Sequence, residues 1–110
     1  MDSRLLSGAL DMLILEVISQ GSNYGYQISQ TVGSHSGGYF ELKEGSLYPA
    51  LHRLERNKLL ASFWQSADGR RRKYYRLTKS GQKALAAKKQ EWTVFSAGVD
   101  GVLGAEGGMA

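Results

Sequence analysis

The chemistry of this sequence is concentrated in a run of four basic residues, Arg70, Arg71, Arg72 and Lys73. Guanidinium and ammonium groups bind phosphate through charge-assisted hydrogen bonds. The run follows Asp68 and Gly69, a pair typical of tight turns, so we expect it at the tip of a hairpin, over residues 68–72, where no hydrophobic core could accept it. Taken alone, such a run can also be a solvated surface, and that alternative stays open.

A second group of candidate side chains shares one predicted helix, over residues 43–58. The leucines at positions 47, 51 and 54 are spaced by four and three residues and form its buried stripe. Tyr48, His52 and Arg53 must therefore project elsewhere. Arg53 could read guanine or hold a phosphate. A half-buried position at the flank of the helix is an equally good interpretation of His52.

The charges are segregated along the chain. Residues 53–89 contain twelve Lys or Arg and two acids, a local balance of +10, which leaves −6 for the rest of a chain whose net charge is +4. Positive charge that is confined to one stretch of the chain in this way favours binding of a polyanionic partner.

The elements that position these residues follow from the apolar spacing. Residues 3–20 form a helix that is apolar around much of its girth, which suggests a second subunit on one side. Residues 24–32 form a second helix, 33–38 a loop, and 39–42 either a loop or a brief extended piece. Pro49 is tolerated in the first turn of the third helix, whose start it places near residues 44–46.

Residues 59–66 and 72–77 are rich in aromatic and apolar strand formers and predict a β-hairpin. Thr78 is a candidate N-cap for a fourth helix running toward Val99, although Gly81 stands where a capping box has Glu or Gln. Five glycines after position 97 predict fraying beyond about Gly101.

Three helices, a two-stranded wing and a further helix describe a mostly α (α+β) winged helix-turn-helix. The expected organisation is a DNA-binding domain over 1–78, a dimerisation helix over 79–101 and a flexible tail over 102–110. The chain of 110 residues has no cysteine and only two separated histidines, so we expect no metal and no cofactor. It has no apolar stretch of membrane-spanning length, and we expect a cytoplasmic protein.

Three motifs carry a resemblance to a known family: GSNYGYQI at 21–28, EGSLYPALHRLE at 44–55 and GRRRKYYRLTKSG at 69–81. Together they resemble the PadR family of bacterial transcriptional regulators. The short chain and single C-terminal helix are similar to its smaller subfamily, which includes a lactococcal multidrug-sensing regulator. The resemblance implies a homodimeric repressor that binds a palindromic operator in double-stranded DNA and is released by a small molecule.

The resemblance also implies residue roles. Ser46, Tyr48 and Pro49, then His52 and Arg53, would contact the groove, and hydroxyls and rings at these positions suit a phosphate or a thymine methyl. Tyr24 could donate to a phosphate, although a core position suits it equally well, and Tyr26 is expected to be a packing residue.

The spacing of Trp92, Phe95, Val99 and Val102 by three, four and three residues predicts a helical seam. The expected dimer interface comprises Leu5, Ala9, Leu85, Trp92, Phe95 and Val99. The alternative is that Trp92 and Phe95 cover the core of their own subunit. In the small subfamily a tryptophan resembling Trp92 stacks aromatic cationic drugs, which implies an aromatic effector site at Trp92, Phe95, Met12 and Leu13.

Two other classes of function remain as alternatives. A winged helix can serve only for protein contacts, because a fold does not dictate a function. An enzyme is disfavoured, because the sequence shows no carboxylate pair, no nucleophile with a base and no phosphate-binding loop.

Overall fold

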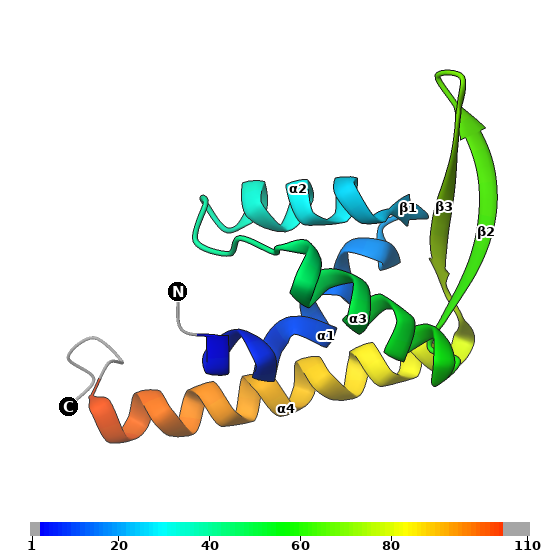
Figure 1. The fold of residues 1–110 in the computed structure, drawn as a ribbon. Helices are drawn as coiled ribbons and strands as arrows, with labels where there is room; N and C mark the ends of the chain where they lie inside the picture. Colours follow the sequence, from blue (N-terminus) through cyan, green and yellow to red (C-terminus); the bar gives the residue numbers. More distant parts are fainter. Residues whose placement is uncertain (1–2, 105–110) are drawn as a thin grey trace.

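The computed structural model describes residues 3–104 (Figure 1). The three helices, the β-hairpin and the fourth helix follow one another in the expected order, so the α+β winged-helix fold is confirmed. No described helix is long and apolar enough to cross a membrane. The elements are α1 (Ser3–Ser19), β1 (Asn23–Tyr24), α2 (Gly25–His35), α3 (Glu44–Arg56), β2 (Leu60–Ala67), β3 (Arg70–Leu77) and α4 (Lys79–Leu103).

The sheet has three strands rather than the two expected, in the order β1-β3-β2. Strands β2 and β3 form the wing, a hairpin over residues 60–77 whose register runs from Leu60 opposite Leu77 to Ala67 opposite Arg70. Strand β1 pairs with β3 only at Tyr74 and Tyr75. Two residues cannot show an alternating pattern, which is why this strand was not predicted.

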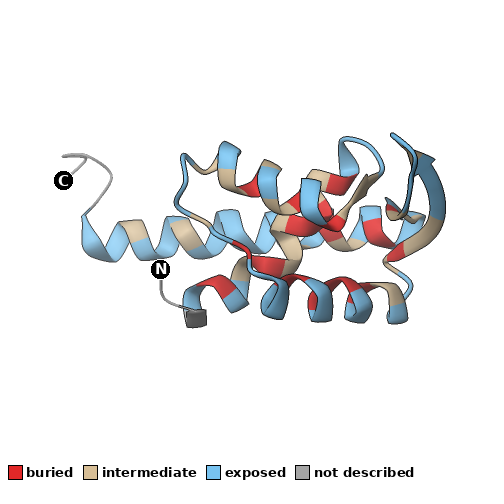
Figure 2. Cartoon of the chain, turned by 45° about the horizontal axis from the view of Figure 1, so that its top comes forward, coloured by how far each residue is buried: buried red, intermediate tan, exposed pale blue. Residues whose placement is uncertain are grey.

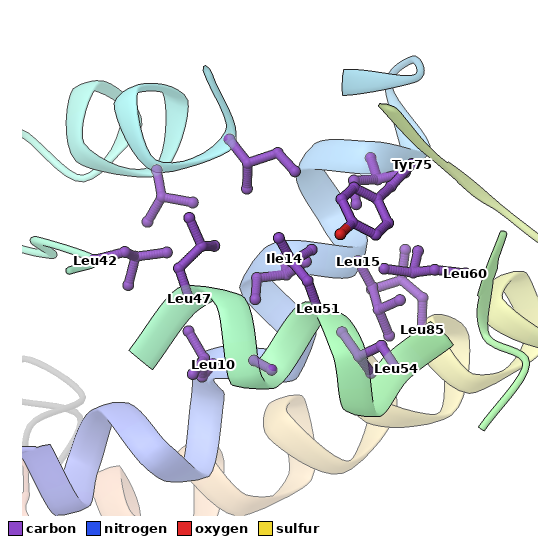
Figure 3. Packing of buried hydrophobic residues seen from close by; sticks show 14 of the residues in the cluster. Leu10, Ile14, Leu15, Leu42, Leu47, Leu51, Leu54, Leu60, Tyr75 and Leu85 are labelled. Carbon is purple, nitrogen blue, oxygen red and sulfur yellow. The ribbon is translucent and has the colours of Figure 1, made fainter. Parts of the chain in front are cut away.

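The core lies where α1, α3 and the base of the wing meet (Figure 3). Ile14 and Leu15 of α1 and Leu51 of α3 are fully buried, which confirms the stripe predicted on α3. Tyr75 enters from β3 and is 2% exposed, so the wing is joined to the helices by an aromatic side chain. Leu85 of α4 packs into the same cluster.

The connection between α2 and α3 differs from expectation. The loop predicted from Gly33 begins later, because α2 continues to His35. The hydroxyl of Ser36 donates to the Gly33 carbonyl and accepts from the Phe40 amide, and these bonds close the last turn of the helix. Residues 39–42 form no strand. Leu42 is buried in the core, so the segment is held by packing instead of pairing.

Helix α4 starts as predicted at a Thr78 cap, whose hydroxyl accepts from the amide of Gly81. A Cβ on Gly81 would lie 2.1 Å from the Leu59 carbonyl oxygen, which explains why glycine occupies a position that suits Glu or Gln in other helices. The helix runs to Leu103, past the fraying expected at Gly101, and ends on Gly104 at φ 71°. Of the tail expected over 102–110, positions 105–110 lie outside the described residues.

Candidate nucleic-acid interface

A groove of about 560 Å³ separates the wing from α2 and α3. It is the place where the predicted contacts from distant parts of the sequence meet. Its walls come from β1, α2, α3 and both strands of the wing. They comprise Tyr24, Gly25, Tyr26, Tyr48, His52, Trp64, Arg70, Arg71, Arg72, Lys73 and Tyr75. Ser46 and Pro49 lie outside the groove and are exposed at the start of α3.

Helix α3 has one buried and one exposed face. Leu47, Ala50, Leu51 and Leu54 are buried, and the exposed side presents Ser46, Tyr48, Pro49 and His52. Pro49 belongs to the early part of the helix, as expected from its missing N–H. His52 is exposed, so the structure does not support a half-buried histidine.

Tyr48 is oriented by the first residue of α2. A Cβ built on Gly25 would lie 2.6 Å from the Tyr48 hydroxyl oxygen and 2.8 Å from its ring, so the ring rests directly on the glycine backbone. The side chain is 36% exposed. Gly25 is thus a candidate functional residue that sequence reasoning missed, because its role depends on a contact across two helices.

The turn of the wing is narrower than expected. Only Asp68 and Gly69 form it, with φ values of 53° and 76° that suit a two-residue hairpin turn. Arg70 follows the turn, and Arg71, Arg72 and Lys73 lie within β3, paired with Ser66, Gln65 and Trp64 of β2. The basic residues therefore form a row along a strand instead of a cluster at a tip.

Two arginines of this row lie over aromatic rings. The guanidinium carbon of Arg71 is 5.0 Å from the centre of the Trp64 ring, and that of Arg72 is 4.5 Å from the centre of the Tyr24 ring. Trp64 is 58% exposed, and no sequence motif pointed to it. Such contacts order the long arginine side chains before any ligand binds.

Tyr24 is compatible with both of its interpretations, while the expectation for Tyr26 is wrong. Tyr24 is half-buried, packs edge-on against Tyr74 at 5.3 Å and still lines the groove. Tyr26 is 63% exposed and lines the groove as well, so it is not a packing residue. Helical spacing gave no sign of this, because the groove is closed by the wing, about forty residues further along.

Two of the expected DNA contacts are held by acids of their own chain. Arg53 pairs with Asp11 of α1 at 2.5 Å. The ammonium of Lys73 lies 3.3 Å from a carboxylate oxygen of Glu55 on α3. Glu55 also accepts a hydrogen bond from the Ser62 hydroxyl, and this bond, followed by the contacts of Lys73, lowers the pKa of Glu55.

A second surface, apolar in character, lies between α1 and α4. We call it the α1–α4 surface, and it encloses a hollow of about 600 Å³ lined by Leu5, Gly8, Ala9, Met12, Tyr39, Phe40, Lys88, Glu91, Trp92 and Phe95. Figure 2 shows how little of the outer half of α4 is covered. Trp92 and Phe95 are 51% and 64% exposed, so they do not cover the core of their own subunit.

Some of the other residues expected on this surface lie on it, and two of them pack against the core instead. Leu5 and Val99 are exposed, and Met12 lines the hollow beside Trp92. Leu85 is 7% exposed and packs in the core, so its place in a dimer interface was predicted wrongly. Leu13 packs against the core and does not line the hollow, so it was wrongly placed among the effector residues. Both lie on helices that are apolar on more than one side, where spacing alone does not identify the outer face.

Comparison with known proteins identifies relatives over most of the chain. Residues 14–87 match the model of the transcriptional regulator PadR-like family. The transcriptional regulator Rv3488 of Mycobacterium tuberculosis is 34% identical over 82 residues, which are 74% of this chain and 74% of that protein.

Solved structures agree with this match. A transcriptional regulator from Clostridium thermocellum superposes with a TM-score of 0.84 at 32% identity and covers 91% of this chain and 95% of its own. A PadR-like transcriptional regulator from Bacillus cereus gives a TM-score of 0.80 at 36% identity and covers 91% of this chain and 96% of its own. These relatives are regulators of transcription and not enzymes.

Proposed function

This chain belongs to the PadR-like family of transcriptional regulators, and from that premise we propose that it is a homodimeric repressor of a palindromic operator. The family makes it a DNA-binding regulator, and the sign of regulation, the dimer and the operator symmetry are our proposal. Such a regulator would act in the cytoplasm, where the DNA is.

The observation that carries the proposal is the groove between α3 and the wing. Its lining combines Tyr48 and His52 of α3 with Arg70, Arg71 and Arg72 of the wing. In winged helices the third helix enters the major groove and the wing lies along the neighbouring backbone. We infer that Ser46, Tyr48, Pro49 and His52 contact bases or adjacent phosphates, while the three arginines and Tyr24 hold phosphates. Arg53 and Lys73 would first have to leave their ion pairs.

The dimer is supported by the α1–α4 surface. Leu5, Trp92 and Phe95 of this surface are 69%, 51% and 64% exposed, so a single subunit leaves large apolar side chains in contact with water. A second copy would cover them. A two-fold dimer presents two α3 helices related by symmetry, and this symmetry requires a palindromic site.

The hollow on the same surface supports an effector site. The ring centres of Trp92 and Phe95 on α4 lie 6.1 Å apart, Met12 of α1 lines the same hollow, and Glu91 adds a carboxylate. Aromatic faces with a nearby acid suit a flat aromatic cation. We propose that such a molecule releases the operator, as the resemblance to the small, multidrug-sensing subfamily suggests.

Two variants test the division of labour in DNA binding. Replacing Arg70, Arg71 and Arg72 by Ala should weaken binding to operator and random duplexes alike and reduce the salt slope by about 0.9 for each phosphate that is no longer neutralised. Tyr48→Ala should mainly reduce the preference for the operator, by a factor that corresponds to about 1–3 kcal/mol. Fluorescence anisotropy at several salt concentrations measures both effects. Equal losses on both duplexes in both variants contradict the assignment.

The same titrations test the alternative of a protein-binding module. An acidic protein could use the row of arginines without any DNA. In that case the wild-type chain would bind neither duplex at low salt, where electrostatic binding is strongest.

A further inference from the structure

Glu55 is an acid in the most basic part of the molecule. Only Glu55 and Asp68 carry negative charge among residues 53–89. Asp68 lies in the turn of the wing, far along the hairpin from α3. Glu55 lies in the last turn of α3, next to the strands of the wing, so its charge opposes phosphate binding at the place where helix and wing meet.

The carboxylate of Glu55 contacts both strands of the wing. One oxygen accepts the hydrogen bond of the Ser62 hydroxyl on β2. The other oxygen lies 3.3 Å from the ammonium of Lys73 on β3. A single side chain of α3 therefore holds two strands at once.

The contacts are part of one face of the wing. Ser62 pairs with Tyr75 and Trp64 pairs with Lys73, so these four side chains lie on the same side of the hairpin. Tyr75 is buried in the core, and the Lys73 ammonium lies 5.5 Å over its ring. The face of the wing that turns toward α3 is thus held at two places. Tyr75 is packed in the core, and Glu55 contacts Lys73, two residues further toward the turn of the wing.

The partly exposed setting decides what this cluster can do. The Lys73 and Glu55 side chains are 33% and 32% exposed, so the ion pair adds little to stability. The Lys73–Glu55 ion pair and the Ser62 hydrogen bond can still select one orientation of the hairpin. For this they need only make the other orientations of the hairpin less favourable. The contacts are directional, and they join elements that have to reach DNA together.

We propose that Glu55 is a positioning residue for DNA binding, which fixes the angle between α3 and the wing through Ser62 and Lys73 and keeps Lys73 away from phosphates. This inference rests on the proposed DNA-binding function. The angle determines whether the arginines of β3 meet the backbone while α3 occupies the groove. Glu55 therefore acts on the ratio of specific to non-specific affinity.

The principal experiment uses Glu55→Gln in the full chain. The probes are a duplex that the wild-type protein selects from random-sequence DNA and a shuffled duplex of the same composition. We expect weaker binding to the selected duplex and tighter binding to the shuffled one, with the ratio falling about fivefold to tenfold, or about 1–1.4 kcal/mol. The released Lys73 should steepen the salt slope by about 0.9 for each subunit.

Two matched pairs separate position from charge. Asp68→Asn removes the other acid of the basic stretch and keeps a residue that tolerates φ 53°. It should raise both affinities by one factor and leave their ratio unchanged. Ser62→Ala removes a hydrogen-bond donor at constant charge and should lower the ratio without changing the slope, whereas Ser66→Ala, exposed on the same strand, should change neither.

Two results overturn the proposal. One is that Glu55→Gln and Asp68→Asn shift both duplexes by the same factor, which means that Glu55 acts only through its charge. The other needs no DNA: residual dipolar couplings show the same fixed orientation of the wing relative to α3 in wild type, Glu55→Gln and Ser62→Ala. A wild-type chain that binds no duplex contradicts the proposed function, and the couplings still decide whether Glu55 fixes the wing.

Discussion

The position of Tyr48 depends on a residue with no side chain. The Tyr48 ring occupies the space where any other residue at position 25 would place its Cβ. A glycine at the start of α2 thereby controls the orientation of an aromatic ring on the neighbouring helix. Base contacts require positions accurate to a fraction of an ångström, so this glycine belongs to the binding surface although it need not touch DNA.

Gly25→Ala should therefore displace Tyr48 and weaken binding to the selected duplex by about threefold to tenfold, while random duplexes are bound nearly as before. The displaced atoms are the far end of a side chain, so the free energy of unfolding should change by less than about 1 kcal/mol. Gly33→Ala in the same helix is the control, because its Cβ would meet only an ordinary contact at 3.5 Å. Unchanged specificity in Gly25→Ala would show that Tyr48 does not read the operator.

At this scale the sequence predicted side-chain chemistry better than side-chain partners. It identified the row of arginines and the exposed side of α3. It could not show that Arg53 meets Asp11, 42 residues away, or that Trp64 lies under Arg71. Such pairs depend on tertiary distance, and spacing within one helix or strand carries no information about it.

Among the elements, the junction of wing and α4 has the least room for change. The Thr78 hydroxyl shares its one proton between the carbonyls of Lys58 and Leu59, and its oxygen accepts from the amide of Gly81. The first turn of α4 thus lies directly against the start of β2. The glycine is required by this approach, since a Cβ there would overlap the Leu59 carbonyl.

Gly81→Ala should lower the free energy of unfolding by more than about 2 kcal/mol, because the added Cβ would clash with the Leu59 backbone, which cannot turn aside as a flexible side chain can. Thermal and urea unfolding should show the loss. Gly98→Ala in the same helix has open space around its Cβ and should stabilise the chain by up to about 1 kcal/mol. A Gly81→Ala protein with wild-type stability would mean that α4 can move away from Leu59 at no cost.

The ion pairs between elements make stability depend on acid. The Lys89 hydrogen bond, assisted by that of Gln20, lowers the pKa of Glu16, as the Ser62 hydrogen bond does for Glu55. A lowered pKa means that the ionised form stabilises the fold. This contribution is complete well above the unfolded pKa of about 4.3 and is lost as pH falls through the folded values.

Thermal unfolding of the Glu16→Gln/Glu55→Gln variant should accordingly depend less on pH than the wild type below about pH 4.5. Near neutral pH the variant should be slightly less stable, by an amount limited by solvent screening. Melting curves from about pH 3 to 7, recorded by circular dichroism, supply the comparison. Parallel curves for the two proteins would show that neither carboxylate is stabilised by folding.

Element order was predictable because periodicity and turn residues extend over many positions. Strand β1 and the last turn of α2 were not, since each depends on a few contacts: pairing with Tyr74 and Tyr75 in one case, the Ser36 hydroxyl in the other. Short elements are decided by tertiary structure, and long ones by their own sequence.

At the scale of the whole molecule, the uncovered half of α4 implies a second subunit. Phe95→Glu places a charge in the centre of the α1–α4 surface and should give a monomer in sedimentation experiments. The selected duplex should then be bound about a hundredfold more weakly, because the two half-sites are no longer held together. Thr93→Glu adds the same charge on the side of α4 that faces away, and it should remain a dimer.

If Phe95→Glu sediments like the wild type, the assembly uses another surface or does not exist. The sequence suggested the association through the spacing of Trp92, Phe95 and Val99. It misplaced Leu85 because the spacing of apolar residues does not show whether a side chain of α4 packs against its own core or faces outward, and only the folded chain distinguishes the two.

The molecule is 57 Å long and 22 Å in its shortest dimension, and α4 accounts for much of that length. The first turn of α4 is fixed against Leu59, while its last four turns do not pack in the core. At 1.5 Å per residue, the middle of this uncovered part lies roughly 25 Å along the helix from the first turn. Because the helix is rigid, a tilt of about 5° moves two points that lie this far apart by about 2 Å relative to each other. This is more than half the 3.4 Å rise of one base pair. A ligand bound beside Trp92 could thus change the distance between the two α3 helices of a dimer without touching either of them.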